Sequence, residues 1–207
     1  MSKDCCAPEI DETNKNWKQV LIVALILNIA MFFVEIIASQ QSGSMALQAD
    51  ALDFLGDAFN YGISLYVVSH TIFIRAKASI LKSLFMIGFA LFITIETLFK
   101  IRSGGLPSPP TMGTIGSIAL AVNLTVAALL FKYRGGDSNM RSVWLCTRND
   151  AIGNLMVIAA AFLVHYTRSG WPDWIAGLVL AVLGLQSGIH VFNLARNELH
   201  SNPRVIN

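Results

Sequence analysis

Six apolar runs, separated by short polar stretches, dominate the chain. The stretches between them are rich in glycine, proline, serine or basic residues, as in KIRSGGLPSPPT, and such sequences favour turns and loops. An α-helix needs about 20 mostly apolar residues to cross the hydrocarbon of a bilayer. The fold class that we predict is therefore all-α, a polytopic membrane protein of six transmembrane helices. The predicted spans cover about residues 17–38, 45–74, 83–99, 112–131, 142–166 and 174–194.

The composition supports this interpretation and limits the alternatives. Hydrophobic residues make up 54% of the 207 residues and charged residues 14%, which leaves no room for a sizeable soluble domain. We expect a tail at residues 1–16, a six-helix membrane domain at 17–195 and a second short tail at 196–207. The first run lacks a signal-peptide cleavage pattern, so we expect it to be retained. Cys5, Cys6 and Cys146 do not form the pattern of a disulfide framework.

The basic residues are distributed unequally between the two sets of loops. The loop that we expect between the second and third spans contains three of them, Arg75, Lys77 and Lys82. Because basic residues gather on the cytoplasmic side of membrane proteins, both termini are predicted to be cytoplasmic. Basic residues placed in this way argue for membrane orientation and against nucleic-acid binding. The predicted inner side holds Lys3, Lys15, Lys18, Arg75, Lys77, Lys82, Lys132, Arg134, Arg141, Arg196 and Arg204, and the outer side Lys100, Arg102 and Arg168.

The second span contains three aspartates, although an ionisable residue inside a bilayer is unfavourable and usually marks an ion or proton pathway. At 100° per residue, Asp50, Asp53, Asp57 and Asn60 fall within an arc of about 80° on one helix face. Asp50 is close enough to the helix start to act as a cap. Asp57 would lie about 18 Å into the bilayer, too deep for that role.

The fifth span contains a second polar face, where Cys146, Asp150 and Asn154 recur at intervals of four residues. If the two faces meet, Asp53, Asp57, Asp150 and the Cys146 thiolate would form a four-ligand oxygen and sulfur set. Such a set suits a tetrahedral, zinc-like ion. Two alternatives stay open, because Cys146 can also be a small buried hydrophobe, with Asn149 or water completing the site.

Other polar residues of these spans are candidates for supporting roles. Glu35 of the first span is either a proton relay or an interfacial acid near the outer turn. Several carboxylates in a dry site cannot all stay ionised, so metal binding should release protons and couple transport to a proton gradient. The supporting residues that we predict, as second ligand shell or proton relay, are Asp50, Asn60, Asn149, Asn154 and Glu35.

Two stretches, SGSMALQADALDFLGDAFNYGISL and CTRNDAIGNLMVIAAA, resemble the cation diffusion facilitator family of metal/proton antiporters. In its second helix the family has an acidic residue or histidine four positions before an aspartate, which matches Asp53 and Asp57. In its fifth helix a histidine or aspartate stands four before an aspartate, where this chain has Cys146 and Asp150. The resemblance spans all six predicted helices and implies a homodimer. We expect a short form without the cytosolic metal-binding domain that follows the sixth helix in the family.

The predicted function is divalent metal efflux in exchange for protons by alternating access, in a bacterial inner membrane. Zinc and cadmium are the expected metals, with cobalt or iron as further candidates. We expect a secondary transporter, not an enzyme, with no fixed cofactor, and with metal ions, protons, lipid and a second copy as partners. An aspartate-lined cation channel is the alternative. A membrane enzyme with Asp57 and Asp150 as an aspartic dyad is a third reading, but no substrate-binding motif accompanies it.

Overall fold

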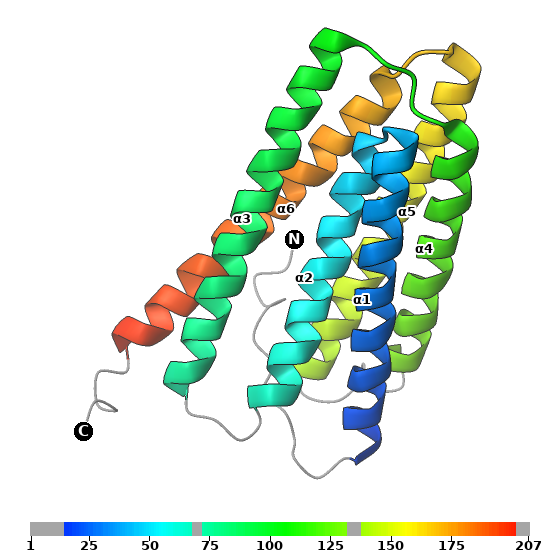
Figure 1. The fold of residues 1–207 in the computed structure, drawn as a ribbon. Helices are drawn as coiled ribbons and strands as arrows, with labels where there is room; N and C mark the ends of the chain where they lie inside the picture. Colours follow the sequence, from blue (N-terminus) through cyan, green and yellow to red (C-terminus); the bar gives the residue numbers. More distant parts are fainter. Residues whose placement is uncertain (1–14, 68–71, 132–137, 202–207) are drawn as a thin grey trace.

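A computed structural model describes residues 15–67, 72–131 and 138–201, and within these ranges it contains six helices and no strand. This confirms the predicted all-α class. The predictions for Cys5, Cys6 and the first tail up to residue 14 lie outside the described residues. The helices, shown in Figure 1, are α1 (Lys15–Ser42), α2 (Met45–Val67), α3 (Ile72–Ser103), α4 (Pro109–Phe131), α5 (Ser138–Thr167) and α6 (Trp171–Ser201).

The boundary between the second and third helices differs from the prediction. The basic stretch that was expected to be a loop belongs to α3, which begins at Ile72 and includes Arg75, Lys77 and Lys82. Lysine and arginine are good helix formers, so a helix can continue where the hydropathy falls. Hydropathy therefore indicates the edge of the apolar segment but not the end of the helix.

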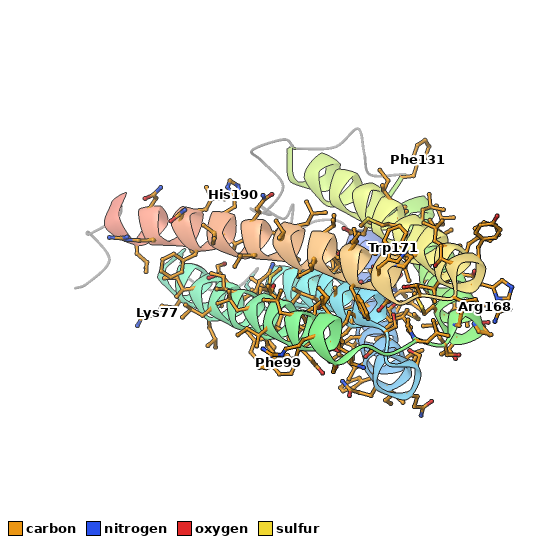
Figure 2. All side chains as sticks on the ribbon, turned by 90° about the horizontal axis from the view of Figure 1, so that it is seen from above. Lys77, Phe99, Phe131, Arg168, Trp171 and His190 are labelled. Atoms are coloured by element: carbon orange, nitrogen blue, oxygen red, sulfur yellow. The ribbon has the colours of Figure 1, made fainter. Side chains whose placement is uncertain are left out.

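The large apolar side chains of the bundle point outward, as expected where lipid is the solvent. Phe33 is 57% exposed, Phe99 69% and Phe162 69%, and Figure 2 shows Phe99 on the outside of α3. Five helices, α1, α3, α4, α5 and α6, are long and apolar enough to cross a membrane. The remaining helix, α2, has 23 residues, the same number as α4, but it includes three aspartates.

Helix α2 lies at the centre of the bundle and contacts each of the other five helices. Its first turns, from Met45 to Leu52, are buried throughout. Two glycines let α6 approach it closely, as small residues do between membrane helices. A Cβ atom at Gly177 would lie 2.9 Å from the backbone of Met45, and one at Gly184 would lie 2.6 Å from Leu52 Cδ2.

A side chain of α6 also holds the start of α2. The carboxylate of Asp173 accepts hydrogen bonds from the backbone N–H groups of Met45 (2.8 Å) and Ala46 (3.1 Å) and from the Ser44 hydroxyl. Ser44 in turn accepts a hydrogen bond from the N–H of Leu47 at 3.1 Å, as an N-cap residue does. Together these bonds satisfy N–H groups that have no partner within the helix.

The helices associate as neighbouring pairs, with α1 beside α2, α3 beside α6 and α4 beside α5 (Figure 1). Helix α1 begins and helix α6 ends at the same end of the bundle (Figure 1). That arrangement suits the predicted orientation with both termini on one side, although the choice of side remains a prediction.

Candidate metal site

The acidic face of α2 is directed toward α5. Asp50 is 1% exposed and Asp57 9%, while Asp53 is half-buried. A Cβ atom on Gly153 of α5 would lie 3.7 Å from Asp50 Oδ1 and 3.8 Å from Asp53 Oδ2. Two carboxyl groups of α2 therefore lie beside the backbone of α5 at Gly153.

Asp57 and Asp150 face each other between the two helices. Their carboxyl groups lie within hydrogen-bonding range, and since ionised carboxylates only accept hydrogen bonds, a bond between them needs a proton on one. The Tyr61 hydroxyl donates to Asp57 Oδ2 at 3.1 Å, and the Asn60 side chain lies near the same carboxyl group. Among the described residues, buried Asp150 Oδ2 has no donor.

Asp50 belongs to a chain of polar side chains that crosses three helices. Its Oδ2 accepts a hydrogen bond from Asn154 Nδ2 of α5 at 2.7 Å. Asn154 Oδ1 accepts another from Asn123 Nδ2 of α4 at 2.8 Å. The alternative in which Asp50 caps α2 is therefore wrong, because Ser44 and Asp173 fill that role.

Glu35 approaches the same polar chain from α1. It is 0% exposed, so its carboxyl group faces the interior of the bundle. Its carboxyl group interacts with that of Asp50 at hydrogen-bonding range. Neither of its oxygens has a donor among the described residues, so a proton on one carboxyl group is what would join the two.

Part of the predicted ligand set falls outside these observations. Helix α5 includes Cys146 and Asn149, but their side chains lie outside the described part of the structure. Among the side chains that are described, no three histidine, cysteine, aspartate or glutamate groups gather closely enough to hold a metal ion. Asp57 and Asp150 are adjacent. The described residues alone do not form a complete set of metal ligands.

Three residues near the acidic side chains were missed by the sequence analysis. Tyr61 follows Asp57 by four positions, a spacing that could have revealed it, and Asn123 is a polar residue within the apolar fourth run. Lys82 was assigned to a loop, yet it is 4% exposed and donates a hydrogen bond from Nζ to Asn60 Oδ1. Only its tertiary surroundings distinguish it from a lysine at the membrane surface.

Membrane-length helices around a central helix with buried carboxyl groups define a multi-pass membrane protein with an acidic interior. The family described as "Cation efflux transmembrane domain" matches residues 21–77 and 74–199. The chain belongs to this family, which confirms the resemblance drawn from the two aspartate motifs. Family, helices and bacterial relatives together identify a multi-pass protein of a bacterial inner membrane.

Three curated relatives illustrate the similarity. The "Cadmium, cobalt and zinc/H(+)-K(+) antiporter" of Bacillus subtilis is 27% identical over 88% of this chain. The "Metal cation efflux system protein CzcD" of Cupriavidus metallidurans is 23% identical over 80%, and the "Zinc transporter ZitB" of Escherichia coli 25% over 86%. The matches cover 62%, 55% and 61% of the respective relatives, so this chain spans about three fifths of their length.

Proposed function

We propose that this protein is a secondary transporter that exports divalent metal ions in exchange for protons. The observation that carries the proposal is the set of carboxyl groups of α2 and α5, Asp57 against Asp150 above all, inside a membrane-length bundle of the cation efflux family. Buried negative charges are unfavourable without a compensating cation. A divalent ion supplies two positive charges at the place where these carboxylates crowd together.

We assign the metal ligands to Asp53, Asp57, Asp150 and Cys146, with Asn149 or water as the alternative to the thiolate. The described carboxylates must draw closer together to bind an ion. An oxygen and sulfur set favours zinc and cadmium, and cobalt and iron are further candidates. The names of the relatives, which include zinc, cadmium and cobalt, support the same range of metals.

Two pairs of carboxyl groups are suited to hold the exchanged protons. A proton between Asp57 and Asp150 must leave when a metal ion binds there. The pair of Glu35 and Asp50 continues through Asn154 into the bundle, and we assign it the role of a relay that moves protons to and from the metal site. Asn60, beside Asp57, supports the ligands as a second-shell residue.

The wider assembly follows the same proposal. Residues 17–195 form the transport domain, and two copies associate as a homodimer in the lipid bilayer. The protein acts as a transporter, not as an enzyme. A channel lined by the same aspartates is the alternative that the experiment must separate.

The test is metal flux in sealed proteoliposomes that contain the purified protein and a trapped metal-sensitive dye. An antiporter gives saturable zinc or cadmium uptake driven by an imposed pH gradient, together with proton counterflow. A channel instead gives flux that follows an imposed membrane potential without proton movement. Absence of metal movement under either gradient, with correctly folded protein, contradicts the proposal.

A further inference from the structure

Lys82 is a basic residue buried inside the bundle, beside the acidic side chains of α2. It lies ten residues after the first residue of α3, about 15 Å along the helix, and is 4% exposed. Its Nζ donates a hydrogen bond to Asn60 Oδ1. Asn60 lies one helical turn after Asp57 on α2, and the ammonium group of Lys82 is near enough to the Asp57 carboxyl group to influence its charge.

Burying an ammonium group is unfavourable unless negative charge and hydrogen bonds compensate it. Asp57, with Asp53 and Asp150 close by, supplies that charge. Lys82 therefore supplies part of the positive charge that this acidic interior needs. It does so from α3, a helix that contributes none of the proposed metal ligands.

A divalent ion bound at Asp57 would occupy the same field as this ammonium group. Two cations close together in a medium of low polarity repel each other strongly. The charge of Lys82 therefore lowers the affinity of the site for the metal. When the metal leaves, Lys82 is again attracted to Asp57 without competition. A charge attached to the protein also acts at a high effective concentration, since it never diffuses away.

We propose that Lys82 is an internal counter-cation that competes with the transported metal for Asp57 and thereby promotes metal release. This inference rests on the proposed function and adds a residue that sets metal affinity and turnover without binding the metal. Lys82 is thus a positioning residue whose effect comes from its charge.

Zinc binding and zinc transport by the wild type and four variants test the inference. Lys82→Gln keeps a hydrogen-bond donor for Asn60 but removes the charge, whereas Lys82→Arg keeps the charge. We expect Lys82→Gln to bind zinc about tenfold tighter, with a lower KM and a lower kcat because release slows. Lys82→Arg should stay close to the wild type. Lys77→Met, an exposed position of the same helix (Figure 2), serves as the matched control and should change neither quantity.

The outcomes separate this inference from the proposed function. If wild-type protein transports zinc and folded Lys82→Gln binds it with unchanged or weaker affinity, Lys82 has a structural role and the inference is wrong. If Lys82→Gln does not fold, Lys82→Met and Lys82→Arg are compared in membranes instead. The inference then requires zinc to bind more tightly to Lys82→Met than to Lys82→Arg, and equal affinities overturn it. If the wild type moves no metal, the proposed function fails and this inference fails with it.

Discussion

The buried carboxyl groups differ in the hydrogen-bond donors around them, and that difference indicates where a proton or a cation could bind. Asp50 has the amide of Asn154 and Asp57 the hydroxyl of Tyr61. Asp150 and Glu35 face other carboxyl groups, with oxygens that lack a donor among the described residues. Such groups are unfavourable for folding, so they indicate places where a proton or a cation binds.

The first prediction concerns the aspartates between α2 and α5. Asp57→Ala and Asp150→Ala should each reduce zinc transport by about a hundredfold or more, because each removes a charged ligand from a small ligand set. Asp53→Ala should behave in nearly the same way, whereas Asp50→Ala should leave measurable activity. Flux in proteoliposomes, at equal amounts of folded protein, checks these expectations. Uptake close to wild type in Asp57→Ala would remove this residue from the ligands.

The second prediction concerns metal preference and depends on Cys146. A thiolate favours zinc and cadmium over harder ions such as manganese. If Cys146 is a ligand, Cys146→Ser should reduce cadmium transport much more than manganese transport, and Cys146→His should restore zinc transport. Parallel flux measurements with the three metals provide the readout. Unchanged cadmium-to-manganese ratios in Cys146→Ser would leave a site of carboxylates with Asn149 or water.

At this scale, sequence reasoning identified side chains that share a helix face but not those that meet across helices. A rotation of 100° per residue was enough to group Asp50, Asp53 and Asp57 on α2. The contacts of Lys82 with Asn60 and of Glu35 with Asp50 depend on how α3 and α1 pack against α2. That packing has no local sequence signature, so Lys82 was taken for a loop residue.

Among the elements, α2 and α6 show how glycine positions determine the packing. The third prediction is that Gly177→Val lowers the thermal unfolding temperature of the purified protein, because any Cβ atom there meets the Met45 backbone at 2.9 Å. Overpacking of this kind typically costs about 1–3 kcal/mol. Gly88→Ala on α3, where a Cβ atom meets nothing within 4 Å, is the control and should not destabilise the protein. Equal unfolding temperatures for Gly177→Val and the wild type would contradict the close packing.

The elements themselves were largely predictable, since each of the six apolar runs corresponds to a helix. The error at the start of α3 has a physical cause. Its first residues combine apolar side chains with Arg75, Lys77 and Lys82, and charge lowers hydropathy without interrupting helical hydrogen bonds. The pattern of apolar residues indicates which part of a helix lies in the hydrocarbon. It does not show how far the helix extends beyond it.

Taken as a whole, the bundle contains more buried acid than buried base. Among the described residues, Lys82 is buried together with four acids, and the partly buried Asp53 and Asp150 add to the acid. The four buried acids are Glu35, Asp50, Asp57 and Asp173. Because the described helices bury a surplus of carboxyl groups, the charge state of the interior must change when a divalent ion enters.

The fourth prediction is that zinc binding releases protons, and more of them at pH 6 than at pH 8. At the lower pH more carboxyl groups hold a proton that the metal must displace. Calorimetric titrations in buffers of different ionisation enthalpy measure the number released at each pH. Equal release at both values, or none, would require a proton carrier other than these carboxyl groups.

The three aspartates of the central helix also affect how the protein is made. An aspartate at the middle of a membrane helix opposes translocon-mediated insertion by roughly 2.5–3.5 kcal/mol, so α2 alone is a poor insertion substrate. Helix α1, apolar throughout its middle and packed along α2, can enter the bilayer with it as a hairpin. In a microsomal glycosylation assay, α2 should insert efficiently when α1 precedes it and poorly when it stands alone. On this prediction, the residues proposed to bind the metal ion also make insertion of the nascent chain depend on cooperation between neighbouring segments.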